Sequence, residues 1–239
     1  MQLPIFCLLL PVILVSSGLS QKSAPPKPTS HTIRTIEGWK VRVDDRLLSG
    51  PDALLGKQAL RMLSNQLFNI TLALPEPRLK ALRKVMIEMD QTCGELKSEQ
   101  YHPSADWLKE HGYPTELAKC VHIPDASYFS AASHQRQQPW AVMHELAHSY
   151  HDQVLSFEEP RILEQWKKVV KNGHFDNVLH IDGGRVKHYA LTDQKEFFAE
   201  MTEVYLGMND FYPFNHAELK VSEPEIYALM HDIWETDVK

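Results

Sequence analysis

The segment from Trp140 to Tyr150 constrains this chain more than any other, because it sets two histidines and a glutamate at fixed spacing in an apolar stretch. It contains the pattern H-E-x-x-H, which begins at His144 and ends at His148. In a helix, residues four apart lie on one face about one turn apart, so the two imidazoles can bind one Zn²⁺. Glu145 can then take a proton from a water at the metal. The spacing predicts a helix that carries two metal ligands.

The neighbours of the motif favour a metal over an ordinary pair of helix histidines. Val142, Met143, Leu146 and Ala147 make the helix apolar around the motif. A buried cluster of ionisable groups needs a partner, and a metal ion is the most effective one. The alternative is two histidines that form salt bridges or caps.

Zinc needs a third protein ligand, and catalytic sites leave the fourth position to water. The extended pattern H-E-x-x-H-x-x-G-x-x-H is excluded, because His151 and Val154 stand where it requires glycine and histidine. His151 itself is a second option, but a straight helix does not easily bring three such side chains to one ion. We expect His151 to support a ligand or to face solvent. The third option is a carboxylate on a later helix.

A later helix is predicted from Leu191 to Gly207. Thr192 or Asp193 can cap its start, and Gly207 is a typical residue just past a helix end. Apolar side chains cover most of its circumference: Phe197, Phe198, Met201, Val204, Tyr205 and Met208.

Three glutamates of this helix form a separate row at spacings of four and three: Glu196, Glu200 and Glu203. Such a row is often a solvated face. Because the rest of the helix is apolar, Glu196 is the candidate zinc ligand, and Glu200 would accept a hydrogen bond from a ligating histidine. We expect Glu203 to face solvent.

H-E-x-x-H together with Glu-Phe-Phe-Ala-Glu at 196–200 resembles the catalytic domain of anthrax lethal factor, in the Glu-zincin metallopeptidases. The resemblance implies that Glu196 is the third zinc ligand. It also implies that Tyr189, seven residues earlier, donates a hydrogen bond to the developing oxyanion or to the leaving amine. The alternative for Tyr189 is a buried packing role.

The resemblance covers about Trp140 to Gly207. The rest of the chain looks like a small secreted family of zincin-like proteins with unassigned substrates, marked by Tyr101–Trp107 and Asn209–Phe214. We expect no receptor-binding or substrate-docking domain, so the substrates of lethal factor are not carried over.

The N-terminus predicts export. Residues 1–20 form an apolar run followed by Gly18 and Ser20, small residues suited to a signal-peptide cleavage site. A retained anchor is the alternative, although the run is short for a membrane span. Residues 21–30 predict a flexible lead-in, and residues 31–239 a single zincin-like metallopeptidase domain. No later segment is expected to span a membrane.

The charge and the cysteines of the chain bear on what it binds and how it is cross-linked. We expect no binding to nucleic acid, because the net charge is −6 and the chain has no basic stripe. Cys93 and Cys120 remain after signal removal, and either one disulfide or two free thiols is open. Glycosylation at Asn69 and the oligomeric state stay open.

Hydrophobic periodicity and turn residues predict the remaining elements. The expected elements are a hairpin in Thr32–Val43, helices at Pro51–Phe68, Ser104–Glu110, Arg161–Lys171 and Glu223–Trp234 (capped by Ser222), a helical turn at Pro77–Arg83, strands at Val85–Met89 and Lys119–Ile123, and a hairpin from Val178 to Tyr189. Strands gathered early with ligand-bearing helices later indicate an α+β, zincin-like fold, with a small mixed sheet, an active-site helix and a C-terminal helical subdomain. We expect residues 120–127 to border the cleft and pair with extended substrate.

The sequence therefore predicts a secreted zinc peptidase that acts on polypeptide, with Glu145 as general base. Two alternatives stay open: a non-catalytic zincin-fold binding protein, and a zinc hydrolase of a small amide substrate. A cleft open at its ends would favour polypeptide, and a closed pocket the small substrate.

Overall fold

The computed structural model describes residues 25–236. The signal peptide predicted at 1–20 and the first part of the lead-in, 21–24, lie outside the described residues.

The N-terminal half is built on a five-stranded mixed sheet in the order β1-β2-β3-β5-β4. Its strands are β1 (His31–Ile36), β2 (Trp39–Asp44), β3 (Ile87–Met89), β4 (Gln100–Tyr101) and β5 (Val121–Ile123). The β1–β2 hairpin is confirmed. Its two-residue turn places Glu37 and Gly38 at φ of 48° and 93°, the left-handed conformation that matches the twist of the strands. β2, β3 and β5 run parallel, and β4 is antiparallel to β5.

Helices cover the sheet and make up the C-terminal half. They are α1 (Ala53–Ala73), α2 (Glu76–Leu82), α3 (Ala105–Glu110), α4 (Ala126–Phe129), α5 (Ala132–Gln137), α6 (Ala141–Tyr150), α7 (Pro160–Asn172), α8 (Gln194–Leu206), α9 (His216–Ser222) and α10 (Pro224–Trp234). A second, two-stranded sheet is formed by β6 (Val178–Leu179) and β7 (Arg185–Val186). None of the described helices is both long and apolar enough to cross a bilayer.

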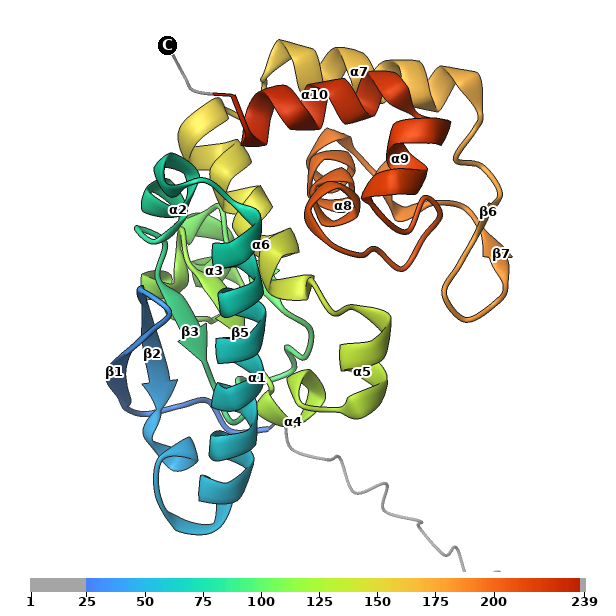
Figure 1. The fold of residues 1–239 in the computed structure, drawn as a ribbon. Coiled ribbons are helices and arrows are strands. Elements are labelled where there is room, and N and C mark those ends of the chain that lie inside the picture. The colour runs from blue at the N-terminus through green and yellow to red at the C-terminus, as the bar shows by residue number, and fades with distance from the viewer. Residues whose placement is uncertain (1–24, 237–239) are drawn as a thin grey trace, which may run out of the picture.

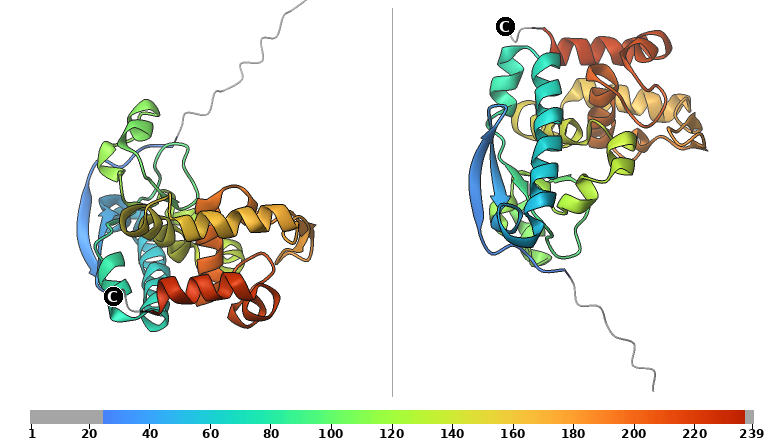
Figure 2. Two further views of the ribbon diagram at one scale, coloured as in Figure 1. Left: turned by 90° about the horizontal axis from the view of Figure 1, so that it is seen from above. Right: turned by 60° about the horizontal axis from the view of Figure 1, so that its bottom comes forward.

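The arrangement confirms the expected α+β class. α1 runs along the sheet, α7 to α10 gather at the other side, and α6 lies between the two groups (Figure 1). Seen from above, α7 and α10 lie side by side, and they contact each other and α8 (Figure 2). The mixed sheet, the helix α6 that carries the H-E-x-x-H motif and the C-terminal helical part are the three components that the zincin-like interpretation requires.

Several predicted helix boundaries follow from local rules. Ser104 caps α3 and accepts a hydrogen bond from the Asp106 backbone N–H at 3.2 Å, as expected. α1 continues beyond the predicted end at Phe68, because Ile70 extends its buried side, and it stops before Pro75.

The cap predicted for the last helix is wrong. Ser222 ends α9, and its hydroxyl donates to the Glu218 carbonyl at 2.9 Å instead of capping α10. Glu223 holds the N-cap position of α10. The sequence pattern missed the short helix α9, which occupies the serine.

The strand expected to pair with substrate is also placed differently. β5 lies between β3 and β4, so the outer strand of the sheet is β4. The His102 backbone N–H donates to the Cys120 carbonyl at 3.2 Å and extends this pairing. The prediction that residues 120–127 pair with extended substrate is therefore wrong for the strand, because Gln100–Tyr101 already pairs with it.

Candidate metal centre

α6 presents the two motif histidines on one face. The ring centroids of His144 and His148 are 4.8 Å apart, and the rings meet edge-on. α6 contacts α1, β4, β5 and α8, so its apolar residues are buried while this face looks toward α8.

α8 brings Glu196 to the same face. The Asp193 carboxylate accepts hydrogen bonds from the backbone N–H groups of Lys195 and Glu196, at 2.8 and 3.0 Å, which fixes the first turn of the helix. Glu196 Oε2 then lies 3.1 Å from His144 Nε2 and 3.4 Å from His148 Nε2. These three ligand atoms, from residues far apart in the chain, all lie within 4.8 Å of one another.

The three residues fit zinc. Two imidazole nitrogens and one carboxylate are the donors of a catalytic His₂Glu zinc site, which keeps a position for water. The side chains of His144, His148 and Glu196 are 12%, 11% and 20% exposed, so solvent reaches the point where they meet.

The carboxylate that contacts His144 from behind is Glu203. Its Oε1 lies 2.6 Å from His144 Nδ1, whereas the nearest oxygen of Glu200 lies 3.6 Å away. Glu203 is 4% exposed, so the expectation that it faces solvent is wrong. Its spacing of seven from Glu196, about two helical turns, places both on one face and is the signal that could have found it.

Glu200 is buried next to this contact. It accepts a hydrogen bond from Asn209 Nδ2 at 2.9 Å, and its Oε2 also lies 3.7 Å from His188 Nδ1. Asn209 lies in the segment 209–214 that the sequence singled out without a function. Its role here is to hold the Glu200 carboxyl group.

Burial and mutual contacts shift the pKa values of the histidine and glutamate side chains in this centre. Burial acts to lower the pKa of His144, but the hydrogen bonds that its ring donates to Glu196 and Glu203 outweigh this and raise the pKa well above its usual range. Burial acts to raise the pKa of Glu196, but its bonds to His144 and His148 lower it. Burial and then the charge of Glu203 raise the pKa of Glu200. Among the described residues, the cavity is lined by several acidic side chains but by no lysine or arginine, and a divalent ion would balance part of the negative charge.

Glu145 lines the same cavity. Its Oε2 accepts a hydrogen bond from the Tyr101 backbone N–H of β4 at 2.6 Å. Burial raises the pKa of the Glu145 carboxyl group, against the opposing charges of His144 and His148. A raised pKa brings a carboxylate closer to the range in which it accepts and returns a proton.

Tyr189 also lines this cavity. It begins a short 3-10 turn, Tyr189–Leu191, whose preceding residue His188 accepts a hydrogen bond from the Ala190 backbone N–H at 3.1 Å. The hairpin predicted from Val178 to Tyr189 ends earlier, at β7. Tyr189 is 46% exposed, so it is not the buried packing residue of the alternative interpretation. Burial and then the charge of Glu196 raise the pKa of its hydroxyl group, which keeps it a hydrogen-bond donor.

The residues enclose a cavity of about 480 Å³. Its walls come from α6, α8, the Tyr189 turn, the β4 segment and the loop after α8: Ser98, Glu99, Gln100, Tyr101, Gln138, Ala141, His144, Glu145, His148, Tyr189, Glu196, Glu200, Glu203, Asp210 and Phe211. The structure thus brings all six sequence-predicted site residues to one cavity.

His151 is not part of it. The residue is fully buried, and its ring packs against Phe157 and Phe198, at centroid distances of 5.2 and 5.0 Å. Among the described residues neither ring nitrogen has a hydrogen-bond partner. The expectation that His151 supports a ligand or faces solvent is wrong, because the helix continues as a π-helical turn, His151–Leu155, that points the ring into the core.

Cys93 and Cys120 are both buried free thiols, so of the two open alternatives the structure shows the thiols. Asn69 lies on the exposed side of α1, and its glycosylation stays a prediction.

No family model matches this chain, and no curated protein matches it. Among solved structures the chain is similar to the Pro-Pro endopeptidase PPEP-2 from Paenibacillus alvei, with 21% sequence identity and a TM-score of 0.43. The similarity covers 74% of this chain and 90% of that chain. A likeness at this level carries no conclusion about activity.

Proposed function

We propose that this chain is a secreted zinc-dependent peptidase of the His₂Glu type. The observation that carries the proposal is the position of Glu196 Oε2, within 3.4 Å of both motif histidines and in one cavity with Glu145. Zn²⁺, when bound, would supply Lewis acidity toward a water and toward the substrate carbonyl.

The residues of the chain have separate roles in this scheme. His144, His148 and Glu196 would hold the ion, and Glu203 keeps His144 in the tautomer whose Nε2 faces the cavity. Glu145 accepts the proton of the attacking water and returns it to the leaving amine. Tyr189 donates a hydrogen bond to the developing oxyanion.

The outer edge of β4 favours a polypeptide substrate over a small amide. The Tyr101 backbone N–H points to Glu145, so the unpaired side of β4 faces the reacting groups. Ser98 to Tyr101 line the cavity next to it. The outer strand of a sheet can pair with the extended backbone of a peptide.

A peptide-library digest tests the proposal. The purified chain is expected to cleave peptides, and a chelator should abolish cleavage until zinc is restored. Glu145→Gln should keep zinc and lose about 10²-fold to 10⁴-fold in turnover, while Glu110→Gln, an exposed change on α3, is the matched control. Zinc binding without cleavage of any peptide would favour the binding protein, and hydrolysis of small amides alone would favour the third alternative.

A further inference from the structure

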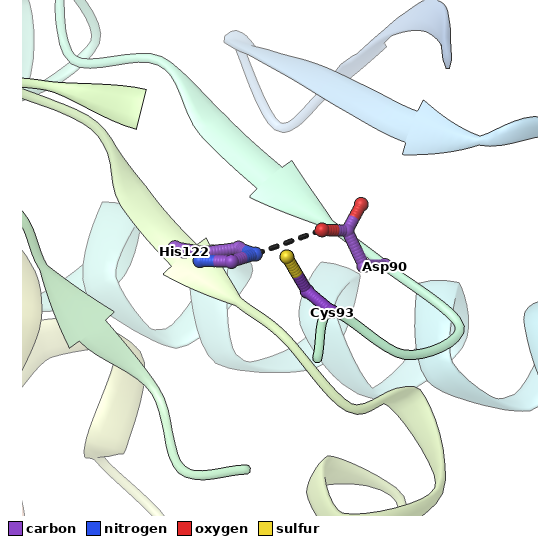
Figure 3. A group of neighbouring side chains, drawn as sticks. All are labelled: Asp90, Cys93 and His122. Atoms are coloured by element: carbon purple, nitrogen blue, oxygen red, sulfur yellow. Dashed lines mark hydrogen bonds and ion pairs between the residues drawn. The ribbon is translucent and has the colours of Figure 1, made fainter. Parts of the chain in front are cut away.

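A second group of potential metal ligands lies in the sheet, away from the cavity. Asp90 directly follows β3, Cys93 lies in the loop after it, and His122 is the middle residue of β5 (Figure 3). All three residues are 0% exposed.

The register of the sheet explains why they meet. His122 pairs with Glu88 across the parallel strands β3 and β5. Side chains two apart on a strand share a face, so Asp90 points to the same side as Glu88 and beside His122. The Asp90 backbone N–H donates to the Ile123 carbonyl at 2.9 Å and holds this end of β3 against β5.

The ligand atoms converge. His122 Nε2 lies 2.8 Å from Asp90 Oδ2, and both lie within 4.8 Å of Cys93 Sγ. Figure 3 shows the thiol directed toward the space between the ring and the carboxylate. These atoms come from three backbone segments and approach one point.

The second ring nitrogen of His122 and the second carboxylate oxygen of Asp90 also form hydrogen bonds. His122 Nδ1 lies 3.1 Å from His102 Nε2, and Asp90 Oδ1 lies 2.8 Å from His31 Nε2. Metal-ligating histidines and carboxylates commonly have such partners, which fix the ring and the tautomer.

A catalytic use of the thiol does not fit this environment. A reactive cysteine is partly exposed in an electropositive setting. Cys93 is fully buried, so it lacks that exposure.

We propose that Asp90, Cys93 and His122 bind a second Zn²⁺, which joins β3, its following loop and β5. Thiolate and imidazole donors select zinc over the oxygen-preferring Mg²⁺ and Ca²⁺. The three side chains would supply three of the four positions of a tetrahedral ion. His102 connects this site to β4, since it directly follows Tyr101, whose backbone N–H contacts Glu145. The second ion would therefore stabilise the strand that forms one wall of the cavity.

Cobalt titration of the purified full chain tests this site separately from the cavity. A thiolate ligand gives Co²⁺ a near-ultraviolet charge-transfer band, and the His144–His148–Glu196 centre contains no thiolate. The unsubstituted chain and Glu196→Ala should both show the band, and Cys93→Ser should lose it. Zinc analysis should give about two ions for the unsubstituted chain and about one for either variant.

Cys120→Ser is the matched control. Cys120 is also a buried free thiol, but its sulfur donates to the Glu116 carbonyl at 3.4 Å and lies 3.5 Å from Arg42 Nη2. Among the described residues it belongs to no group of potential metal ligands. This variant should keep the band and both zinc ions.

The absence of a thiolate band in the unsubstituted chain would overturn the proposal. This measurement does not depend on whether any variant folds. A band that survives Cys93→Ser would overturn it as well. Neither readout uses peptide cleavage, so a chain that cleaves nothing would still reveal the second ion, and failure here would leave the peptidase proposal standing.

Discussion

Two groups of potential metal ligands in this molecule both combine histidine with a carboxylate, but they lie in opposite surroundings, and only one of them adds a thiol. The cavity group, His144, His148 and Glu196, is partly exposed and lies between two helices. The sheet group, Asp90, Cys93 and His122, is sealed inside the strands. The difference lies in access, because an ion in the cavity can exchange a water for a substrate and an ion in the sheet cannot.

The two groups also differ in what supports them. Behind the cavity group lie buried carboxylates of α8, which adjust the histidines electrostatically. Behind the sheet group lie further histidines, His102 and His31, whose bonds cross the sheet. We infer that the first group is built for reaction and the second for rigidity.

The largest expected effect is a loss of peptide turnover in the cavity group, whereas a change in the sheet group should mainly reduce stability. Glu196→Ala should remove the cavity ion and lower peptide turnover by about 10³-fold or more, because the Lewis acid is lost. Asp90→Asn should mainly lower the unfolding temperature, and its kcat per folded molecule should fall far less. Kinetics and thermal unfolding of both variants check this, and equal losses of kcat would remove the distinction between the groups.

Tyr189→Phe tests whether the Tyr189 hydroxyl group takes part in the reaction. Loss of one donor to an oxyanion costs about 10²-fold to 10³-fold in kcat. The zinc content should not change, since Tyr189 supplies no ligand. Tyr128→Phe, a change at another exposed tyrosine on α4, is the control. If Tyr189→Phe matched that control in kcat, the tyrosine would have no part in the reaction.

Loss of the contact between Glu203 and His144 should change the zinc affinity by an intermediate amount. Glu203→Gln should weaken zinc affinity about 10-fold to 100-fold, because it removes the charged partner of a ligating histidine. Glu200→Gln should weaken it less, since its nearest oxygen lies 3.6 Å from His144 Nδ1. Competition with a zinc chelator measures both affinities. The reverse ranking would restore Glu200 as the supporting carboxylate.

His151 shows what burial does to a histidine without a partner. Burial lowers its pKa from 6.5 to about 4. As the pH falls below 6.5, the unfolded chain binds a proton that the folded chain does not, so the free energy of unfolding decreases by about 1.4 kcal/mol per pH unit until pH 4 is approached. Above pH 6.5 the residue is neutral in both states and adds no pH dependence.

His151→Leu should therefore gain about 2 kcal/mol relative to the unsubstituted chain between pH 6.5 and pH 5. Denaturant unfolding at these values, with pH 8 as the reference for packing effects, measures the gain. Parallel pH curves for the two proteins would show that His151 is protonated in the folded chain.

An effect on stability alone is expected at the junction of the two ligand helices. Gly207 lies just past the end of α8, as expected, with a φ of −158°. A Cβ there would lie 1.9 Å from Trp140 Cε2, so the glycine is required by the ring that precedes α6. Gly207→Ala should destabilise the fold by about 1–3 kcal/mol through overpacking. Gly184→Ala, where the nearest atom is the end of the Asp182 side chain, should be close to neutral, and equal stabilities of the two variants would contradict the packing role of Trp140.

Much of the architecture could be predicted because it obeys local rules. The β1–β2 turn follows from Glu37-Gly38, and the start of α8 from the Asp193 cap. The predicted boundaries failed where another element intervened, as α9 did at Ser222. The strand beside the cavity, β4, was not predicted, because it is two residues long and gives almost no periodic signal.

By itself the sequence determined the face of α6 that carries His144 and His148, and the acidic row of α8 opposite them, since helical spacing fixes which side chains share a face. Only the tertiary structure decided that Glu203 and not Glu200 touches His144, and that Cys93 joins Asp90 and His122. Those choices depend on distances between separate elements, and such distances are set by how the whole core packs and not by spacing along the chain.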